Sequence, residues 1–145
     1  MTEGPSANAD GSDWRREAPL PPDVAKGIDE LNRREFFECH ETIEAVWLIA
    51  DDRVRLFYQG ILQVGVACYH VENGNWRGAT NLISGGIEKL EGFAPDWQGV
   101  DVDALLTQAR RCEEEIRRLG PDKLGKFDRA LFPTVRLSSE GNASK

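Results

Sequence analysis

Hydrophobic residues recur at helical spacing through most of the chain, and no segment shows the strict alternation of an exposed strand. Pro22 and Asp23 are typical of a helix start, Asp51 or Asp52 can cap a later helix, and Gly120 before Pro121 ends another. The spacing predicts helices over residues 22–33, 36–50, 52–72, 76–90 and 102–119, with a short turn over 126–132. We therefore expect an all-α bundle of about five main helices.

The helix over 52–72 has the most apolar sequence and is predicted to be central. It contains Gly60 and Gly65, and the next helix contains Gly85 and Gly86. A glycine inside a helix costs up to about 1 kcal/mol. We expect that a close approach of neighbouring helices compensates for this cost.

Two segments of the chain resemble one another. Residues 31–43 align with residues 71–83 at an offset of 40, with Phe36 matching Trp76, Cys39 matching Ala79 and Ile43 matching Ile83. Both segments follow a turn and open a helix. The pattern predicts two helical hairpins packed in the manner of tetratricopeptide repeats.

Composition limits the classes of function. The chain has 145 residues and a net charge of −7, so it is an acidic protein and nucleic acid is not expected as a partner. Its longest apolar stretch, residues 61–71, is too short to cross a membrane. Polar residues 1–20 and 137–145 are expected to be a disordered leader and tail around one domain over 21–136. No secretory signal is visible, which favours a cytoplasmic location.

Three cysteines, Cys39, Cys68 and Cys112, lie among apolar neighbours without a close pair in sequence. This pattern argues against a disulfide framework and against a CxxC zinc site. Buried free thiols are expected at all three positions.

Candidate chemistry lies in the stretch EFFECHETIEAVW, residues 35–47. His40 and Glu44 are four residues apart at the border of its apolar stripe, with Glu41 further round. The central helix carries a narrow polar stripe of Gln59, Gln63 and His70, within about 40° on a helical wheel. An antiparallel hairpin of these two helices would bring the stripe to His40 and Glu44.

Three interpretations of this cluster remain open. The polar side chains can satisfy one another and fix the helix register. His40, Glu44 and His70 can instead hold one divalent ion, such as zinc, iron or manganese. Glu41 or Glu44 can also act with a histidine as proton carriers in catalysis, or the cluster can bind a ligand.

Further residues are candidates for ligand binding. Arg77 begins the helix predicted to pack near residues 36–50, so it can pair with Glu41 or Glu44 or remain exposed. Tyr58 can direct its hydroxyl into the cluster beside Gln59 and Gln63, although most aromatic residues are expected in the core.

The sequence from LNRREFFECHETIEAVW through FYQGILQVGVACYHVENGNWRGATNLISGGIEKL resembles the domain-of-unknown-function family numbered 309. The resemblance covers about residues 31–90 and implies an all-α bundle, without supplying a function. The matching positions are His40, Glu41, Glu44, Trp47, Gln59, Gly60, Gln63, His70, Gly74, Asn75, Gly78 and Ala79.

Two classes of function follow from these patterns. The first is a small binding or protein-interaction module with a His/Glu/Gln cluster, whose partner is a small molecule or a protein. The second is a metal-dependent hydrolase or related enzyme that uses His40, Glu44 and His70. The apolar content of five helices also allows a homodimer.

Overall fold

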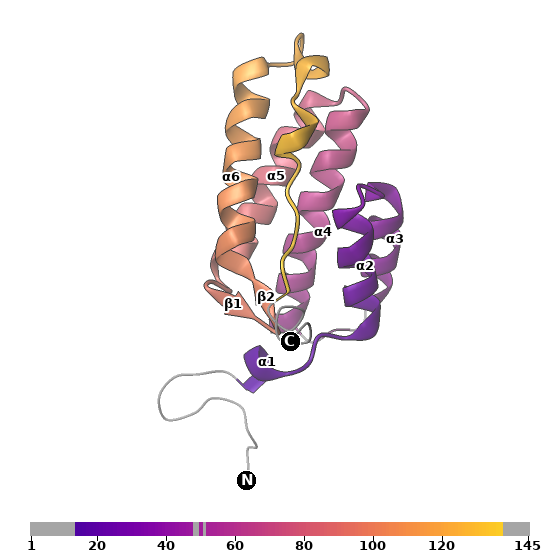
Figure 1. Cartoon of the computed structure of the whole chain (residues 1–145), viewed down its shortest axis with the longest axis vertical. Helices are drawn as coiled ribbons and strands as arrows, with labels where there is room; N and C mark the ends of the chain where they lie inside the picture. The colour runs from indigo at the N-terminus through magenta and orange to yellow at the C-terminus, as the bar shows by residue number, and fades with distance from the viewer. Residues whose placement is uncertain (1–13, 48–49, 51, 138–145) are drawn as a thin grey trace.

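The helices of the computed structural model follow the predicted apolar periodicity (Figure 1). The structure describes residues 14–47, 50 and 52–137, without the side chains of Trp47 and Asp52. The expectations for Asp51, for the side chains of Trp47 and Asp52, and for most of both chain ends therefore lie outside the described part. The main elements are α2 (Pro22–Asn32), α3 (Phe36–Trp47), α4 (Asp52–Glu72), α5 (Trp76–Glu91) and α6 (Val102–Leu119).

Local chemistry fixes where several helices begin and end. The Asn75 side chain accepts a hydrogen bond from the Gly78 amide at 2.9 Å and caps α5. The Asp101 side chain caps α6 in the same way through the Ala104 amide, also at 2.9 Å. Gly120 follows α6 with φ of 72°, a backbone conformation that suits glycine. These caps satisfy backbone groups that a helix end leaves without partners.

The five helices form an array in which sequence neighbours pack together (Figure 1). The predicted all-α bundle is confirmed, and α4 lies between α3 and α5. Gly60 and Gly86 lie at the contact of α4 with α5, where a Cβ on Gly86 would lie 3.0 Å from the Gly60 carbonyl oxygen. The close helix approach expected from these glycines is present.

Two hairpins, α2–α3 and α4–α5, have the same type of turn between their two helices. Arg34 and Gly74, at the predicted offset of 40 residues, both have positive φ, of 66° and 73°. The Glu35 amide donates to the Glu30 carbonyl at 2.8 Å, and the Asn75 amide donates to the His70 carbonyl at the same distance. The internal sequence similarity therefore corresponds to two hairpins with one turn geometry.

Some elements differ from the sequence-based expectation. No strand was predicted, yet β1 (Asp96–Trp97) and β2 (Val100–Asp101) form a short antiparallel ribbon between α5 and α6. Within the expected leader, Trp14–Glu17 forms α1, and Gln98 donates its backbone amide to the Arg16 carbonyl and its side-chain amide to the Arg15 carbonyl. The predicted turn near 126–132 consists of two 3₁₀ turns, η1 (Leu124–Lys126) and η2 (Arg129–Leu131).

The C-terminal segment, residues 121–137, runs back along the bundle to the ribbon (Figure 1). Phe132 packs edge-on against Phe36 with ring centroids 5.1 Å apart, and Phe127 packs on Phe132 at 5.0 Å. Asn32 exchanges two hydrogen bonds with the backbone of Val135, at 3.0 and 2.7 Å. This segment therefore joins the first hairpin to the end of the chain. Among the described helices, none combines the length and apolarity needed to span a membrane.

Candidate functional site

Two aromatic side chains are exposed where α3 meets α4. Phe37 keeps 48% of its surface exposed and Tyr69 keeps 37%, and their ring centroids lie 5.9 Å apart. Phe36 is buried in the core, so its neighbour Phe37, about 100° further round the helix, faces solvent. Cys68 is likewise buried and Tyr69 exposed. Large aromatic groups that stay exposed as a pair mark a candidate contact surface.

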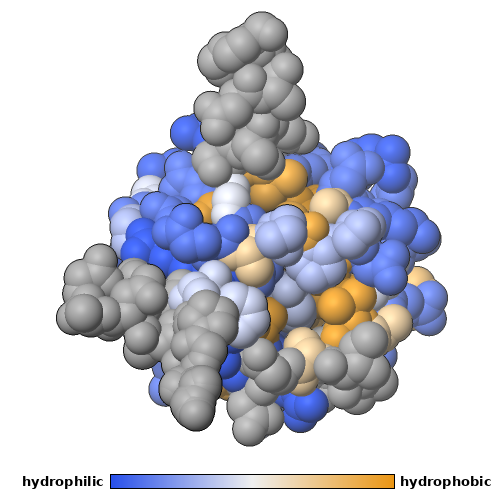
Figure 2. Space-filling model, turned by 90° about the horizontal axis from the view of Figure 1, so that it is seen from below, coloured by the Kyte–Doolittle hydropathy of each residue, from blue (hydrophilic) through white to orange (hydrophobic). Residues whose placement is uncertain are grey.

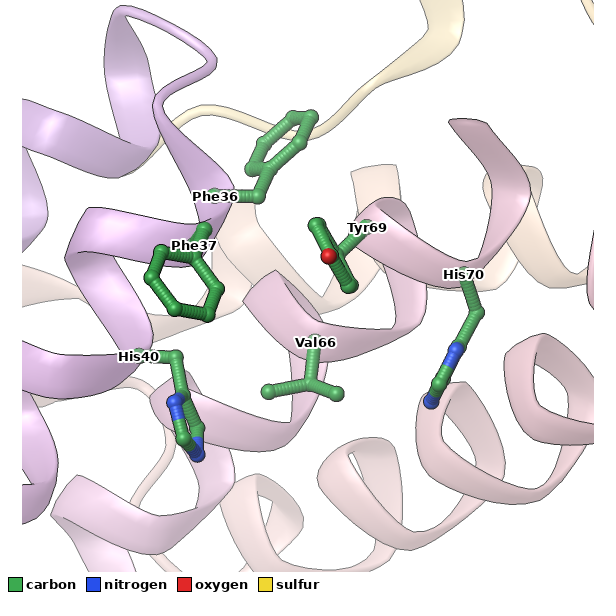
Figure 3. A pocket seen from close by; sticks show the side chains of 6 residues that line it. All are labelled: Phe36, Phe37, His40, Val66, Tyr69 and His70. Carbon is green, nitrogen blue, oxygen red and sulfur yellow. The ribbon is translucent and has the colours of Figure 1, made fainter. Parts of the chain in front are cut away.

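These rings border a pocket of about 140 Å³. Phe36, Phe37 and His40 line it from α3, and Val66, Tyr69 and His70 line it from α4 (Figure 3). Figure 3 shows the Val66 side chain between the two imidazoles, which do not point toward one another. We call these six residues the aromatic–imidazole pocket. The sequence-based prediction placed both histidines at this helix pair but assigned Phe36 and Phe37 mostly to the core.

His40 lies on the α3 side of the pocket. Its Nε2 atom is 3.8 Å from Glu44 Oε1, and the two side chains are 36% and 46% exposed. A side-chain contact this exposed contributes little to stability. Glu44 does not line the pocket, and Glu41 is exposed on the same helix.

His70 is held by the start of α5. The Asn75 Oδ1 atom accepts the Gly78 amide, so the Asn75 side-chain NH₂ group faces His70 Nδ1 at 3.3 Å. Nδ1 accepts this hydrogen bond, and the proton of the neutral ring therefore resides on Nε2. A Cβ at Gly78 would lie 2.8 Å from the His70 ring, so glycine at this position makes room for the imidazole.

The described residues contain no group of three or more histidine, cysteine, aspartate or glutamate side chains arranged to hold a metal ion. The predicted set of His40, Glu44 and His70 is therefore not assembled around one point. Val66 separates the imidazoles, and the closest pair in the set, His40 and Glu44, is 3.8 Å apart.

Within the polar stripe of α4, Gln63 faces α5 and not α3, whereas His70 lines the pocket with His40 as the predicted hairpin implied. Gln63 Oε1 accepts a hydrogen bond from Lys89 Nζ at 3.4 Å, and a Cβ at Gly85 would lie 2.8 Å from this oxygen. Gln59 is half-buried one turn earlier. The absence of a side chain at Gly85 leaves room for the Gln63 amide on the α5 side.

Tyr58 and Arg77 also lie apart from the pocket. The Tyr58 hydroxyl donates to Gln98 Oε1 at 3.0 Å in the protein interior, so it does not enter the histidine cluster. Arg77 is exposed at the start of α5, and within the described chain no ion pair joins it to Glu41 or Glu44.

A second hollow, of about 360 Å³, lies at the lower end of the bundle between α1 and the start of α4. Its lining includes Pro19, Val46 and Val54, together with Tyr58 and Gln98, which bond to one another. Figure 2 views this end, where hydrophobic patches lie between hydrophilic groups. Histidine and acidic side chains are absent from its lining, so it offers less chemistry than the aromatic–imidazole pocket.

The three cysteines are buried free thiols, as predicted. Burial raises the pKa of Cys39 to about 12 and raises the pKa of Cys68 well above its ordinary value, with a hydrogen bond to Cys112 as a further cause. Reactive cysteines need a lowered pKa and some exposure. Cys39 and Cys68 therefore have core positions and no nucleophilic role.

Residues 24–82 match the family described as Domain of unknown function (DUF309). The predicted resemblance is thereby confirmed. The DUF309 match runs from α2 into α5 and includes all six residues of the aromatic–imidazole pocket.

One curated relative is the uncharacterized protein YpuF of Bacillus subtilis (strain 168). It is 32% identical over 93 residues, which cover 62% of this chain and 53% of that protein. The chain therefore spans about half the length of this relative. Neither the family description nor the name of the relative states an activity.

Proposed function

We propose that this chain is a binding module that uses the aromatic–imidazole pocket to hold an apolar side chain of a protein partner. The observation that carries the proposal is the pair of exposed rings, Phe37 and Tyr69, beside a pocket of about 140 Å³. An apolar cavity of roughly 150 Å³ accommodates a benzene-sized group. The pocket therefore has the size of one aromatic or branched aliphatic side chain.

The lining of the pocket favours binding over catalysis. Phe36, Phe37, Val66 and Tyr69 contribute mainly apolar surface, and the two imidazoles supply hydrogen-bonding groups at its edge. Aromatic anchors in small pockets carry much of the affinity of protein interfaces. Glu44, which lies 3.8 Å from His40, does not line the pocket, so the pocket presents no histidine–carboxylate pair to a ligand.

Selection from a displayed library of random peptides tests the proposal. The bait is the full chain, and the double variant Phe37→Ser, Tyr69→Ser serves for counter-selection. We expect enriched peptides to share one apolar anchor and to bind the double variant at least about tenfold more weakly, equivalent to about 1.4 kcal/mol.

Leu56→Ser is the matched control, because Leu56 is 42% exposed on α4 and does not line the pocket. Peptides should bind this variant as tightly as the unchanged chain. Enriched peptides that bind the double variant without loss would place the binding surface elsewhere and contradict the proposal.

A further inference from the structure

The outward face of α3 carries an acidic rim beside the pocket. Phe37, His40, Glu41 and Glu44 follow the i, i+3, i+4, i+7 spacing and so share one face of the helix. Glu38 is exposed further round the same helix. The α3 sequence contains no lysine or arginine, and none lines the pocket. The charged groups that border the pocket from α3 are therefore carboxylates.

These carboxylates lack cationic partners in the described part of the chain. Among the described residues no ion pair involves Glu38 or Glu41, and the one partner of Glu44 is His40, at 3.8 Å. Other glutamates differ, because Glu72 pairs with Arg129 and Glu91 with Arg110. The acidic rim therefore retains a negative potential that a partner can neutralise.

We infer that the partner segment carries an aromatic or branched aliphatic side chain next to lysine or arginine residues. This inference rests on the proposed binding function and adds the charge of the partner. The apolar side chain would enter the aromatic–imidazole pocket while the cations face Glu41 and Glu44. Interfaces place complementary potentials opposite one another, which selects the correct partner.

A second copy of this chain fits the surface less well. The protein has a net charge of −7, and two copies paired through α3 would bring their carboxylates together. Like charges across an interface disfavour association. The acidic rim therefore favours a basic segment of another protein over self-association.

Three probes with one phenyl ring and different charges test the inference on the full chain. The probes are phenethylammonium, 2-phenylethanol and 3-phenylpropionate, and the readout is the NMR shift of the Val66 methyl groups at a pH of about 7.5. We expect the alcohol to bind and the cation to bind about three- to tenfold more tightly than the anion at low salt. The ratio should approach one in about 1 M salt.

Substitution of the acidic rim separates charge from pocket. Glu41→Gln with Glu44→Gln should lower the cation-to-anion affinity ratio to about one, a loss of the same three- to tenfold preference. Glu88→Gln, an exposed glutamate of α5 outside the pocket, should keep the ratio. Binding of 2-phenylethanol to the double variant serves as the check that its pocket persists.

The remaining outcomes distinguish the two proposals. Binding of all three probes with equal affinity, or a ratio that survives the Glu41 and Glu44 substitutions, overturns the inference and leaves the binding function in place. If none of the three probes binds, the result contradicts the pocket itself and thereby the proposed function. Dimerisation in sedimentation experiments that Phe37→Ser abolishes would identify a second copy as the occupant and overturn the basic partner.

Discussion

The imidazoles of His40 and His70 line one pocket but have different neighbours. His40 faces Glu44 at 3.8 Å, whereas His70 accepts a hydrogen bond from Asn75. Catalytic zinc sites use three protein ligands, and the described residues assemble no such group. The metal-dependent hydrolase predicted as an alternative therefore receives no support from the ligand geometry.

Elemental analysis tests this conclusion at the residue scale. Protein purified without a metal-affinity tag should contain less than about 0.1 equivalent of zinc, iron or manganese, because fewer than three ligands hold an ion weakly. The melting temperature should not change when these ions are added. One equivalent of metal that is lost in His40→Ala and His70→Ala would contradict the prediction and favour the hydrolase.

Burial of Cys39 predicts a loss of stability in alkali. Its pKa is raised to about 12 in the folded protein from the ordinary 9.0 that applies to the unfolded chain. This contribution to stability is complete below pH 9 and is lost as the pH rises toward 12, by at most about 1.4 kcal/mol per pH unit. Urea denaturation between pH 8 and 10 should show a shallower pH dependence for Cys39→Ala. Equal slopes for the two proteins would contradict the assigned burial.

At the scale of elements, apolar periodicity predicted the five main helices because each buries one long stripe. The bounds of α4 and α6 agree with the prediction, and the end of α6 follows from Gly120, the signal that the sequence provides there. The ribbon of β1 and β2 was not predicted, because two-residue strands are too short to show a period. Phe37 is exposed because it follows the buried Phe36 and therefore points about 100° away from it on the helix. Apolar periodicity indicates this orientation, whereas the hydrophobic residue type alone would place Phe37 in the core.

The shared hairpin turn predicts opposite effects at its two equivalent positions. Gly74→Ala should destabilise the protein by about 1 kcal/mol, because a side chain is strained at φ of 73°. Arg34→Gly relieves the same strain, but it also removes the guanidinium that lies 5.7 Å from the Phe132 centroid. The expected gain is therefore below about 1 kcal/mol. In thermal or urea unfolding, Gly125→Ala should be close to neutral, since its Cβ would meet open space.

Neighbouring glycines of α5 provide a second comparison. A Cβ at Gly86 would lie 3.0 Å from the Gly60 carbonyl and 3.2 Å from the Val64 amide nitrogen, which are backbone atoms that cannot move alone. Gly86→Ala should therefore cost about 1–3 kcal/mol. Gly85→Ala meets only the end of the Gln63 side chain, and it gains helix propensity of up to about 1 kcal/mol. Equal unfolding midpoints for the two variants would refute the close α4–α5 contact.

At the scale of the whole molecule, the C-terminal segment connects the pocket to the rest of the core. Phe36 lines the pocket and also packs against Phe132 of that segment. Gln108 of α6 binds the same segment through Thr134, with hydrogen bonds of 2.9 and 3.0 Å. Sequence periodicity could not predict these contacts, because they join residues far apart in the chain through an irregular segment. The C-terminal segment, residues 121–137, therefore supports the pocket from behind Phe36.

Substitution of Asn32 tests whether the C-terminal segment and the helices unfold in one cooperative transition. Asn32→Ala removes two hydrogen bonds and leaves the Val135 amide and carbonyl without their partner, at a cost of about 1–3 kcal/mol. Asn81→Ala, an exposed position of α5, should change stability by less than about 0.5 kcal/mol. Urea unfolding followed by tryptophan fluorescence and by circular dichroism should give coincident transitions for each variant. If Asn32→Ala behaves like Asn81→Ala, the C-terminal segment lies outside the cooperative core, and its support for the pocket through Phe36 is dispensable.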